Sequence, residues 1–340
     1  VAGADEAKDT IFYSYNFEPE NFTGAGAGSI QLSDQVIGLK SFRDDLIIFC
    51  RNSLHKLINI NDSATVAIVP ITQNVGCLSK DSIQEIGGDL VFLSPDGIRS
   101  VAGTSRIGDV ELGSVSRQIQ SITSALAKSV DAYTITSSVL RSKSQYRLFY
   151  TQDGESSKVS KGIIGTLTAN GFEWAETKGI QATAFVSGFS ANGVESEFHG
   201  DLKGYVYNHD EGNSFYEAGV AFNIEAQYTT PNYDFGDIGT RKTLHYAKIS
   251  ITPEGEVQPV LRVRYDYEDT SIPQPPDYVL DSVPLPAIFG SAVFGTAIFG
   301  ASNDPMLRQA LQGSGHSCSF RISSIDQSAP YAINGIYINY

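Results

Sequence analysis

The sequence has little of several residue types that would narrow its function. It contains three cysteines, Cys50, Cys77 and Cys318, so at least one must be unpaired and a secreted disulfide framework is excluded. Methionine and tryptophan occur once each. Charged residues make up 18% of the chain, against about 25% in typical soluble proteins. We predict buried free thiols, as in proteins of a reducing compartment.

Segments that would direct the chain to a membrane are also lacking. No run of about 18 apolar residues is present, so we expect no membrane-spanning helix. The first ten residues, VAGADEAKDT, contain neither the basic nor the apolar stretch of a signal peptide. The first residue is not Met, which indicates a processed product or a piece of a longer protein.

The charge balance argues against a tightly held nucleic acid. Acidic residues outnumber basic ones by 38 to 24, which gives a net charge of −14. Such a surface repels phosphate groups, so DNA or RNA is not expected as a ligand.

Motifs that carry known chemistry are missing. The five histidines show no HxH or HExxH spacing, and there is neither a GxSxG motif nor a phosphate-binding glycine loop that opens a helix. His199 and His209 lie on either side of a predicted hairpin, beside Asp201 and Asp210. We interpret them as solvated turn residues rather than as a metal site. The sequence therefore predicts no enzymatic activity, no catalytic residue, no cofactor and no metal.

What the sequence does contain is a loose repeat of short apolar runs separated by Gly, Asp and Ser turns. The runs begin near Leu46, Leu90, Tyr146 and Gly204, at spacings of 44, 56 and 58 residues. Blades of β-propellers recur about every 40 to 50 residues with four strands each. We therefore predict an all-β domain of about four propeller-like blades over residues 1–212, complete in itself or part of a larger propeller.

One stretch interrupts the β pattern. Residues 115–127, VSRQIQSITSALA, place Val115, Ile119, Ile122 and Leu126 at helical spacing, and Ser116 is a suitable N-cap. We predict a short amphipathic helix between the second and third units, with its apolar side packed inside the domain.

Beyond residue 212 the strands become longer and alternate strictly. In residues 261–268, Leu261, Val263, Tyr265 and Tyr267 fall on one face, and charged residues fall on the other. This alternation is typical of a half-buried antiparallel strand. We predict a second domain over residues 213–340, an antiparallel β-sandwich with a docking role.

Residues 287–300 form a short internal repeat, AIFG SAVFG TAIFG. Phe289, Phe294 and Phe299 each precede a glycine and lie five residues apart. Because five is odd, a regular strand would direct successive rings to opposite faces, and the recurring glycine disfavours a helix. We predict a glycine-jointed segment whose three rings insert into a surface, either of its own domain or of a neighbouring protein.

Taken in order, the motifs resemble the nozzle-type β-propeller proteins of bacteriophage tails, which form the lower tail tube of short-tailed phages. The resemblance covers most of residues 35–340. It rests on SFRDDLIIFCRNSLHKL, GGDLVFLSPDGIRSVAGTSRIGDVELGSVSRQI, SKSQYRLFY, FHGDLKGYVYNHDEGNSF, YDFGDIGTRKTLHYAKISI and SCSFRISSIDQSAPYAINGIYINY. It implies an all-β fold, with β-propeller-like blades followed by an antiparallel β-sandwich domain.

The resemblance also implies a structural virion protein that forms a ring, expected to be a hexamer, around the DNA ejection channel. The expected partners are copies of itself, adaptor and fibre proteins of the tail, and phage DNA that passes without sequence-specific binding. The chain itself would insert into no membrane. It would lie in the host cytoplasm during assembly and in the virion afterwards. The interface candidates are Phe289, Phe294, Phe299, Arg241 and Lys242.

The alternative is a carbohydrate-binding or carbohydrate-active β-propeller, such as a receptor-binding tail module. Trp174 is the single tryptophan, but 17 tyrosines could supply surfaces on which sugars stack. Paired carboxylates of propeller glycosidases come from different blades, so the sequence alone does not reveal them.

Overall fold

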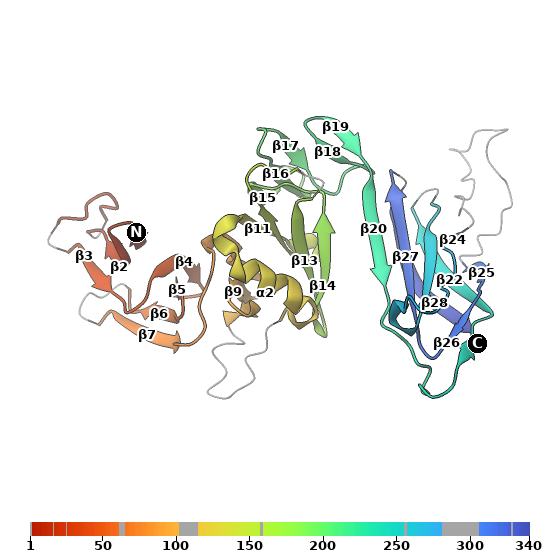
Figure 1. Cartoon of the computed structure of the whole chain (residues 1–340). Helices are drawn as coiled ribbons and strands as arrows, with labels where there is room; N and C mark the ends of the chain where they lie inside the picture. Colours follow the sequence, from red (N-terminus) through yellow and green to blue (C-terminus); the bar gives the residue numbers. More distant parts are fainter. Residues whose placement is uncertain are drawn as a thin grey trace. The chain divides into compact units, whose positions relative to one another are not determined.

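The computed structural model describes residues 2–15, 17–24, 26–60, 65–101, 115–156, 159–254, 257–280, 306–327 and 329–340. These residues form many small antiparallel sheets (Figure 1), which confirms the predicted all-β class. They divide into two compact units, Val1–Glu211 (unit 1) and Gly212–Tyr340 (unit 2). Within the part of the chain that the structure describes, no helix is long and apolar enough to cross a membrane.

The described residues of unit 1 form five antiparallel sheets in which consecutive strands are neighbours. The first is β1 (Ala2–Ala4), β2 (Ala7–Tyr13) and β3 (Gly28–Gln31), and the second is β4 (Val36–Phe42), β5 (Asp45–Cys50), β6 (Leu54–Ile58) and β7 (Ala67–Thr72). The third is β8 (Gln84–Ile86), β9 (Asp89–Ser94) and β10 (Gly97–Ser100), and the fourth is β11 (Thr134–Leu140), β12 (Gln145–Thr151), β13 (Lys161–Thr168) and β14 (Gly171–Lys178). The fifth is β15 (Ala184–Phe189), β16 (Glu195–Gly200) and β17 (Val206–Asn208).

The apolar runs found in the sequence lie in different sheets of this series. Leu46 is in β5, Leu90 in β9 and Tyr146 in β12, and Gly204 directly precedes β17. Each sheet is a meander of three or four strands, as in a propeller blade. The repeat therefore predicted separate small sheets, although it did not identify the first sheet, β1–β3.

Turn chemistry and packing explain why these sheets form. Gly87 and Gly88 connect β8 to β9 with φ angles of 61° and 75°, the left-handed conformation that a two-residue hairpin turn favours. Between sheets, Phe49 of β5 meets Phe92 of β9 edge to face, with ring centroids 5.3 Å apart. Such aromatic pairs join the second and third sheets in one apolar cluster.

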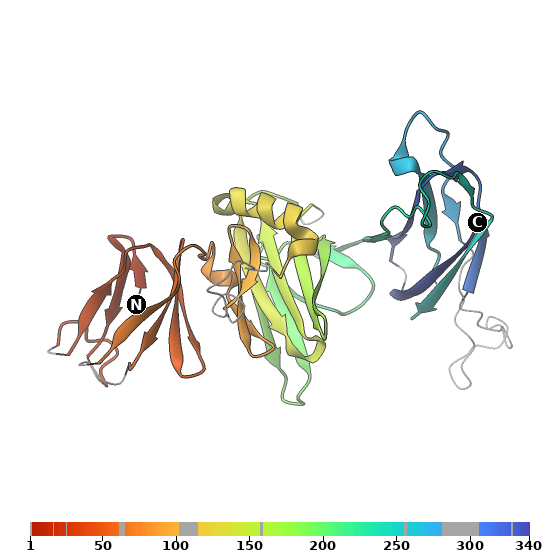
Figure 2. The same cartoon turned by 90° about the horizontal axis from the view of Figure 1, so that it is seen from below.

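The predicted helix is present in two parts, η2 (Arg117–Ile119) and α2 (Gln120–Lys128), seen beside the strands in Figure 2. Leu126 packs with Ile98 and Leu148 in one apolar cluster. Ser116 occupies the predicted N-cap position of η2, but its hydroxyl makes no capping hydrogen bond and instead accepts a hydrogen bond from the Ile98 N–H at 2.9 Å. Short 3₁₀ turns also occur at η1 (Lys80–Ser82), η3 (Val130–Ala132) and η4 (Arg141–Lys143).

Unit 2 is built mainly from two sheets. One contains β20 (Ile224–Thr229), β27 (Cys318–Asp326), β23 (Val260–Tyr265) and β24 (Tyr278–Val279), in that order. The other contains β25 (Met306–Ala310), β22 (Tyr246–Pro253) and β28 (Tyr331–Asn339). The described residues also form two short pairs, β18 (Phe215–Glu217) with β19 (Val220–Phe222), and β21 (Lys242–Thr243) with β26 (Ser314–Gly315).

The core of unit 2 joins the inner faces of the two sheets, as in a sandwich. Ile249 and Ile251 of β22 share one buried cluster with Val263 of β23 and Phe320 of β27. The predicted position of Tyr267 in this core is wrong. The strand ends at Tyr265, and the following turn η5 (Asp266–Glu268) has positive φ at all three residues, which leaves Tyr267 exposed.

Candidate functional site

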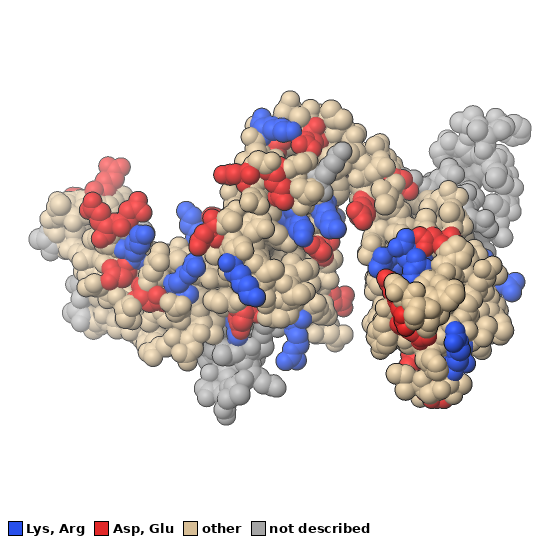
Figure 3. All heavy atoms as spheres, viewed as in Figure 1, with Lys and Arg blue, Asp and Glu red and all other residues tan. Residues whose placement is uncertain are grey.

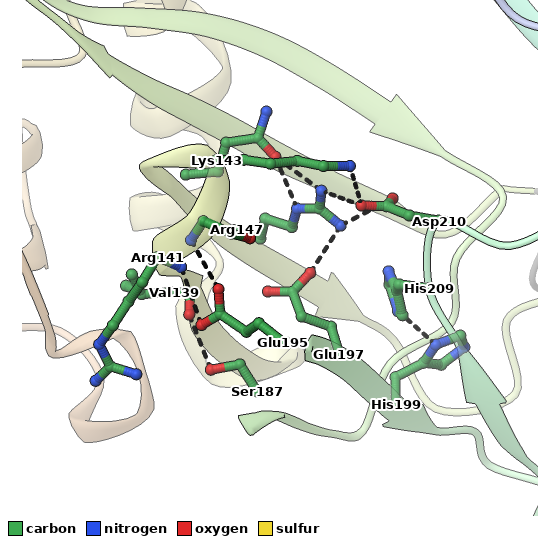
Figure 4. A network of polar contacts seen from close by, with 12 residues as sticks. Val139, Arg141, Lys143, Arg147, Ser187, Glu195, Glu197, His199, His209 and Asp210 are labelled. Carbon is green, nitrogen blue, oxygen red and sulfur yellow. Dashed lines mark hydrogen bonds and ion pairs between the residues drawn. The ribbon is translucent and has the colours of Figure 1, made fainter. Parts of the chain in front are cut away.

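The fifth sheet of unit 1 turns polar side chains toward the fourth sheet. On β16, Glu195, Glu197 and His199 alternate onto one face, and Glu197 and His199 are buried there. Glu195 accepts hydrogen bonds from the Arg141 and Ser142 amides at 3.1 and 2.7 Å. Figure 4 shows these contacts converging from both sheets. The two sheets are therefore joined partly by charged groups rather than by apolar packing alone.

Arg147, on β12, is the centre of this polar cluster. Its Nη1 lies 2.7 Å from Oε2 of Glu197, and its Nη2 lies 2.8 Å from Oδ2 of Asp210 (Figure 4). Its Nη2 also donates to Oε1 of Gln145 at 2.7 Å, and Lys143 Nζ lies 2.6 Å from the same Asp210 oxygen. The buried guanidinium thus holds together two carboxylates that arrive from the fifth sheet and the residues after it.

The pKa values of the two carboxyl groups are shifted in opposite directions. Burial raises the pKa of Glu197 to about 7, against the lowering effect of Arg147. Its contact with Arg147 is an ion pair without hydrogen-bond geometry, and neither carboxylate oxygen of Glu197 accepts a hydrogen bond from the described residues. Burial also raises the pKa of Asp210, but hydrogen bonds from Arg147 and Lys143 outweigh it and lower that pKa to about 2. Near neutral pH, Asp210 is ionised while Glu197 titrates.

Two histidines lie beside this cluster. His199 Nδ1 and His209 Nε2 are 2.7 Å apart, so one ring donates a hydrogen bond to the other. The Phe149 and Phe185 rings pack against His209 at centroid distances of 5.7 and 4.9 Å. Burial lowers the pKa of His199 to about 4 and that of His209 to about 3, so both rings are neutral at pH 7.

The prediction of solvated turn residues is therefore wrong for this histidine pair, because aromatic rings from two sheets cover it. A neutral imidazole pair could hold a metal only with further ligands. Within the described ranges, no group of three or more His, Cys, Asp and Glu side chains is placed to hold a metal ion.

The outer face of the fifth sheet is apolar. Val186, Phe198 and Val206 are 60%, 41% and 73% exposed. Val186 pairs directly with Phe198 across β15 and β16, and Val206 pairs with Gly200 across β16 and β17. A one-sided antiparallel sheet normally buries its apolar face and exposes its polar face. This sheet buries the carboxylates of β16 beside Phe185 on its inner face and leaves apolar side chains on its outer face. We call Val186, Phe198 and Val206 the outer apolar face.

Unit 2 contains a groove of about 900 Å³ between β20 and β28. In the described sheets, β20 and β28 are each an edge strand, so the groove lies along one edge of the sandwich. The lining is mostly apolar, and Tyr228, which points inward from β20, is 51% exposed. The apolar and aromatic side chains that line the groove include Ile224, Ala226, Tyr228, Tyr233, Phe320, Tyr331, Ile333, Ile336, Tyr337 and Ile338, and polar side chains such as Gln227, Ser324 and Asn334 lie among them.

The structure describes two of the five predicted interface residues, Arg241 and Lys242. Arg241 is exposed and donates from Nε and Nη2 to the Ser314 hydroxyl and carbonyl at 2.9 and 3.0 Å. Lys242 pairs with Gly315 in β26, and its Nζ is buried without a hydrogen-bond partner in the described part of the chain. Both therefore contact or pair with β26, and their role in an interface stays a prediction. Phe289, Phe294 and Phe299 lie outside the described residues.

The sequence reasoning did not identify Arg147, Glu197 or the outer apolar face. One signal was available in residues 195–199, ESEFH, where charged residues and histidine alternate with Ser196 and Phe198. That period indicates a strand with one polar and one apolar face. It does not indicate which face is buried.

Comparisons with known proteins leave the function open. No family model matches the sequence, and no curated protein matches it. Among solved structures, the chain is similar to the N-terminal domain of Nup159, with 12% sequence identity and a TM-score of 0.20 over 88% of this chain and 78% of that one. A TM-score this low carries no argument about the fold or the function.

Proposed function

We propose that this chain is a structural component of a tailed-bacteriophage virion that forms a nozzle-type ring around the DNA ejection channel. The observation that carries the proposal is the outer apolar face. Val186, Phe198 and Val206 form a contiguous apolar surface on a regular sheet, and such surfaces mark contacts with other proteins. The motif order of the sequence supports a phage tail as the setting.

The polar cluster gives this face a rigid support. Arg147 holds Glu197 and Asp210, so that the fifth sheet is fixed to the fourth sheet from behind. A rigid surface loses little conformational entropy on association. A heterologous contact made by such a surface gives a ring when the rotation between copies closes after a whole number of copies without a shift along the axis. We assign no catalytic role to the cluster.

The charge distribution supports a conduit rather than a nucleic-acid-binding protein. Figure 3 shows Lys and Arg interspersed with Asp and Glu on the visible face, rather than gathered in one extended basic patch. With a net charge of −14, the surface would repel passing DNA instead of retaining it. The proposed partners are therefore other copies, arranged as a hexamer, and neighbouring adaptor and fibre proteins of the tail.

The test is the oligomeric state of the purified full chain, measured by light scattering and by negative-stain electron microscopy. We expect rings with rotational symmetry. Val206→Asp places a charge on the outer apolar face and should abolish the rings, whereas Val159→Asp, at another exposed valine of unit 1, should leave them intact. A wild-type chain that stays monomeric at high concentration would contradict the proposal.

One observation favours the alternative, a carbohydrate-binding tail module. Four tyrosines, Tyr228, Tyr233, Tyr331 and Tyr337, line the groove of unit 2. Tyrosine rings can stack on the apolar faces of sugars while their hydroxyls form hydrogen bonds. Binding on a glycan array that Tyr228→Ala removes would favour this alternative. A blank array together with a blank hydrolysis screen would exclude it.

A further inference from the structure

We infer that the fifth sheet of unit 1 is released by acid: it separates from the fourth sheet as a unit, while the rest of unit 1 stays folded. The polar cluster around Arg147, Glu197 and the two histidines is the pH-sensitive contact that controls this release. The release is a property of the single chain and takes place whether or not copies assemble.

The fifth sheet lies outside the apolar clusters that hold the described part of the chain together. The described residues form four such clusters, and none of the four contains a side chain from β15, β16 or β17. The other four sheets of unit 1 all place buried side chains in these clusters. A segment with few buried apolar contacts opens at a lower free energy than the whole domain. We therefore expect the fifth sheet to open before the core of the fourth sheet.

The contacts that attach the fifth sheet to the fourth are largely polar (Figure 4). Ser187 Oγ of β15 donates to the carbonyl of Val139 in β11 at 2.8 Å, and Glu195 of β16 accepts from two backbone amides of η4. An aromatic contact accompanies these links, between Phe149 of β12 and Phe185 of β15, with ring centroids 5.0 Å apart. The carboxylates of this attachment take up protons in acid, which weakens it.

Acid also places unbalanced positive charge between the two sheets. At neutral pH, Arg147 and Lys143 pair with carboxylates, and the two imidazoles are neutral because burial lowers their pKa. In acid the carboxylates lose their charge, and protonated His199 and His209 would be two cationic rings with nitrogens 2.7 Å apart, beside Arg147. Like charges repel strongly in a buried site, whereas water screens them. Protonation of the rings therefore favours the open sheet.

The charged and titratable groups around the histidines come from both sheets. From the fifth sheet and its turns come Glu195, Glu197, Asp201, Tyr207 and Asp210, and from η4 and β12 come Arg141, Lys143 and Arg147. The pKa values of Glu195 and Asp210 are lowered in the closed sheet, so both groups cease to favour it as the pH falls. Burial raises the pKa of Glu197 to about 7, so between pH 7 and 4.5 this group opposes release and offsets one histidine. Below pH 4.5 the offset no longer grows, and release becomes steeper.

Release of the sheet precedes unfolding of the chain. The protons that this cluster binds weaken the attachment of the sheet and the whole fold by the same amount. Since opening of the sheet starts from the smaller free energy, falling pH brings that free energy to zero first. In the resulting pH range the fifth sheet is open and the fourth sheet is still closed. The outer apolar face, which belongs to the released sheet, then loses its fixed position.

Hydrogen exchange of the full chain, read by mass spectrometry from pH 7 to pH 3.5, tests the release. Each exchange rate is divided into the intrinsic rate at that pH, which gives a protection factor. Protection of residues 184–208 should fall about tenfold per pH unit between pH 6.5 and 4.5, the effect of one net proton, and more steeply below. Protection of residues 145–151, in β12, should persist where that of the fifth sheet is already lost. Equal loss in both segments, or protection of the fifth sheet that does not change with pH, would overturn the inference.

Two variants test whether the polar cluster is the sensor. The measured quantity is the protection of the fifth sheet at pH 4.5 divided by its protection at pH 7. His199→Gln combined with His209→Gln should raise this ratio at least tenfold above wild type, because neither ring then takes up a proton on opening. His245→Gln, at an exposed histidine of unit 2, is the matched control and should leave the ratio unchanged.

Glu197→Gln tests the opposite sign and keeps both histidines. It removes the group that opposes release, so the ratio should fall at least tenfold below wild type. This variant decides the matter if the double histidine variant does not close at pH 7. A wild-type ratio in Glu197→Gln would overturn the inference. Because the exchange series does not depend on assembly, a chain that forms no rings would remove the proposed function and leave the acid release standing.

Discussion

Arg147 and Glu197 form an ion pair across the fourth and fifth sheets of unit 1, with Nη1 2.7 Å from Oε2 and both side chains almost completely buried. Two charges removed from water gain little net stability from each other, but losing one partner leaves the other charge buried and uncompensated. The fifth sheet therefore stays packed on the fourth sheet only while both partners of the ion pair are present. The outer apolar face depends on it, because that face is the other side of the same sheet.

Replacing Arg147 by Met should lower the free energy of unfolding by about 3–5 kcal/mol, because Glu197 and Asp210 then lose their shared cation. Urea denaturation followed by Trp174 fluorescence measures this, since the single tryptophan lies in β14 of the fourth sheet. Adding Glu197→Leu to the variant should recover part of the loss. An Arg147→Met protein as stable as wild type would contradict the role assigned to the pair.

A surface ion pair in the same sheet provides the control for this measurement. Lys161 Nζ lies 3.8 Å from Glu176 Oε1, and both side chains are partly exposed. Exposed pairs contribute about 0–1 kcal/mol. Lys161→Met should therefore change the free energy of unfolding by less than about 1 kcal/mol. If Lys161→Met lowered the free energy of unfolding as much as Arg147→Met, burial would not explain the difference expected between the two ion pairs.

The histidine pair makes stability depend on pH. Burial lowers the pKa of His199 to about 4 and of His209 to about 3, below the value of about 6.5 for an unfolded chain. Below pH 6.5 the unfolded chain binds protons on these rings that the folded chain does not, so stability is lost as the pH falls. Glu197 opposes this, because its raised pKa lets the folded chain keep a proton between about pH 4.5 and 7.

Two imidazoles outweigh one carboxyl group, so we expect a net loss of stability from about pH 6.5 to 4.5. Replacing His209 by Gln should reduce the slope by about 1.4 kcal/mol per pH unit, the value for one proton. Urea denaturation at a series of pH values measures the slope. His245→Gln, at an exposed histidine of unit 2, is the control and should leave it unchanged. Equal slopes for wild type and His209→Gln would show that the pair is not the cause.

Gly76 should not tolerate a side chain. A Cβ at this position would overlap the carbonyl group of Arg51 and the amide nitrogen of Asn52, which are backbone atoms and cannot rotate away. Gly76→Ala should therefore lower the free energy of unfolding by about 3 kcal/mol. Gly188→Ala is the matched control, because a Cβ there meets nothing within 4 Å. It should change stability by less than about 0.5 kcal/mol, and equal effects at both glycines would contradict the close approach.

The fold class could be predicted from the sequence because its signals are local. The spacing of apolar runs placed Leu46, Leu90 and Tyr146 in separate sheets, and the glycine pair at 87–88 marked a hairpin turn. The end of β23 could not be predicted in this way. Alternation continues through Tyr267, but the backbone turns at Asp266, whose Oδ1 accepts hydrogen bonds from the His316 and Ser317 amides. Those residues are about fifty positions away in the sequence.

The polar cluster also could not be predicted, because contacts between residues distant in the sequence form it. The carboxylates and the imidazole of β16 identify a polar face, but only the packing of Phe149 and Phe185 shows that this face is buried around His209. Likewise, Arg147 looks like an outward residue of an alternating strand. It is buried because Glu197 of the fifth sheet and Asp210, which follows that sheet in the sequence, pack against it. Local period determines which residues share a face, whereas tertiary contacts determine which face is buried.

The three cysteines should be inert in the folded protein. Cys50, Cys77 and Cys318 are free and buried, and burial raises their pKa values to about 11, 12 and 12, respectively. The thiolate is the reactive form, so thiol reagents at pH 8 should modify none of them within hours and all three in strong denaturant. Cys50 and Cys77 lie in unit 1 and Cys318 in unit 2, so labelling at intermediate urea, read by mass spectrometry, should also report which unit opens first. Rapid modification of any cysteine in the native protein would contradict the burial on which this expectation rests.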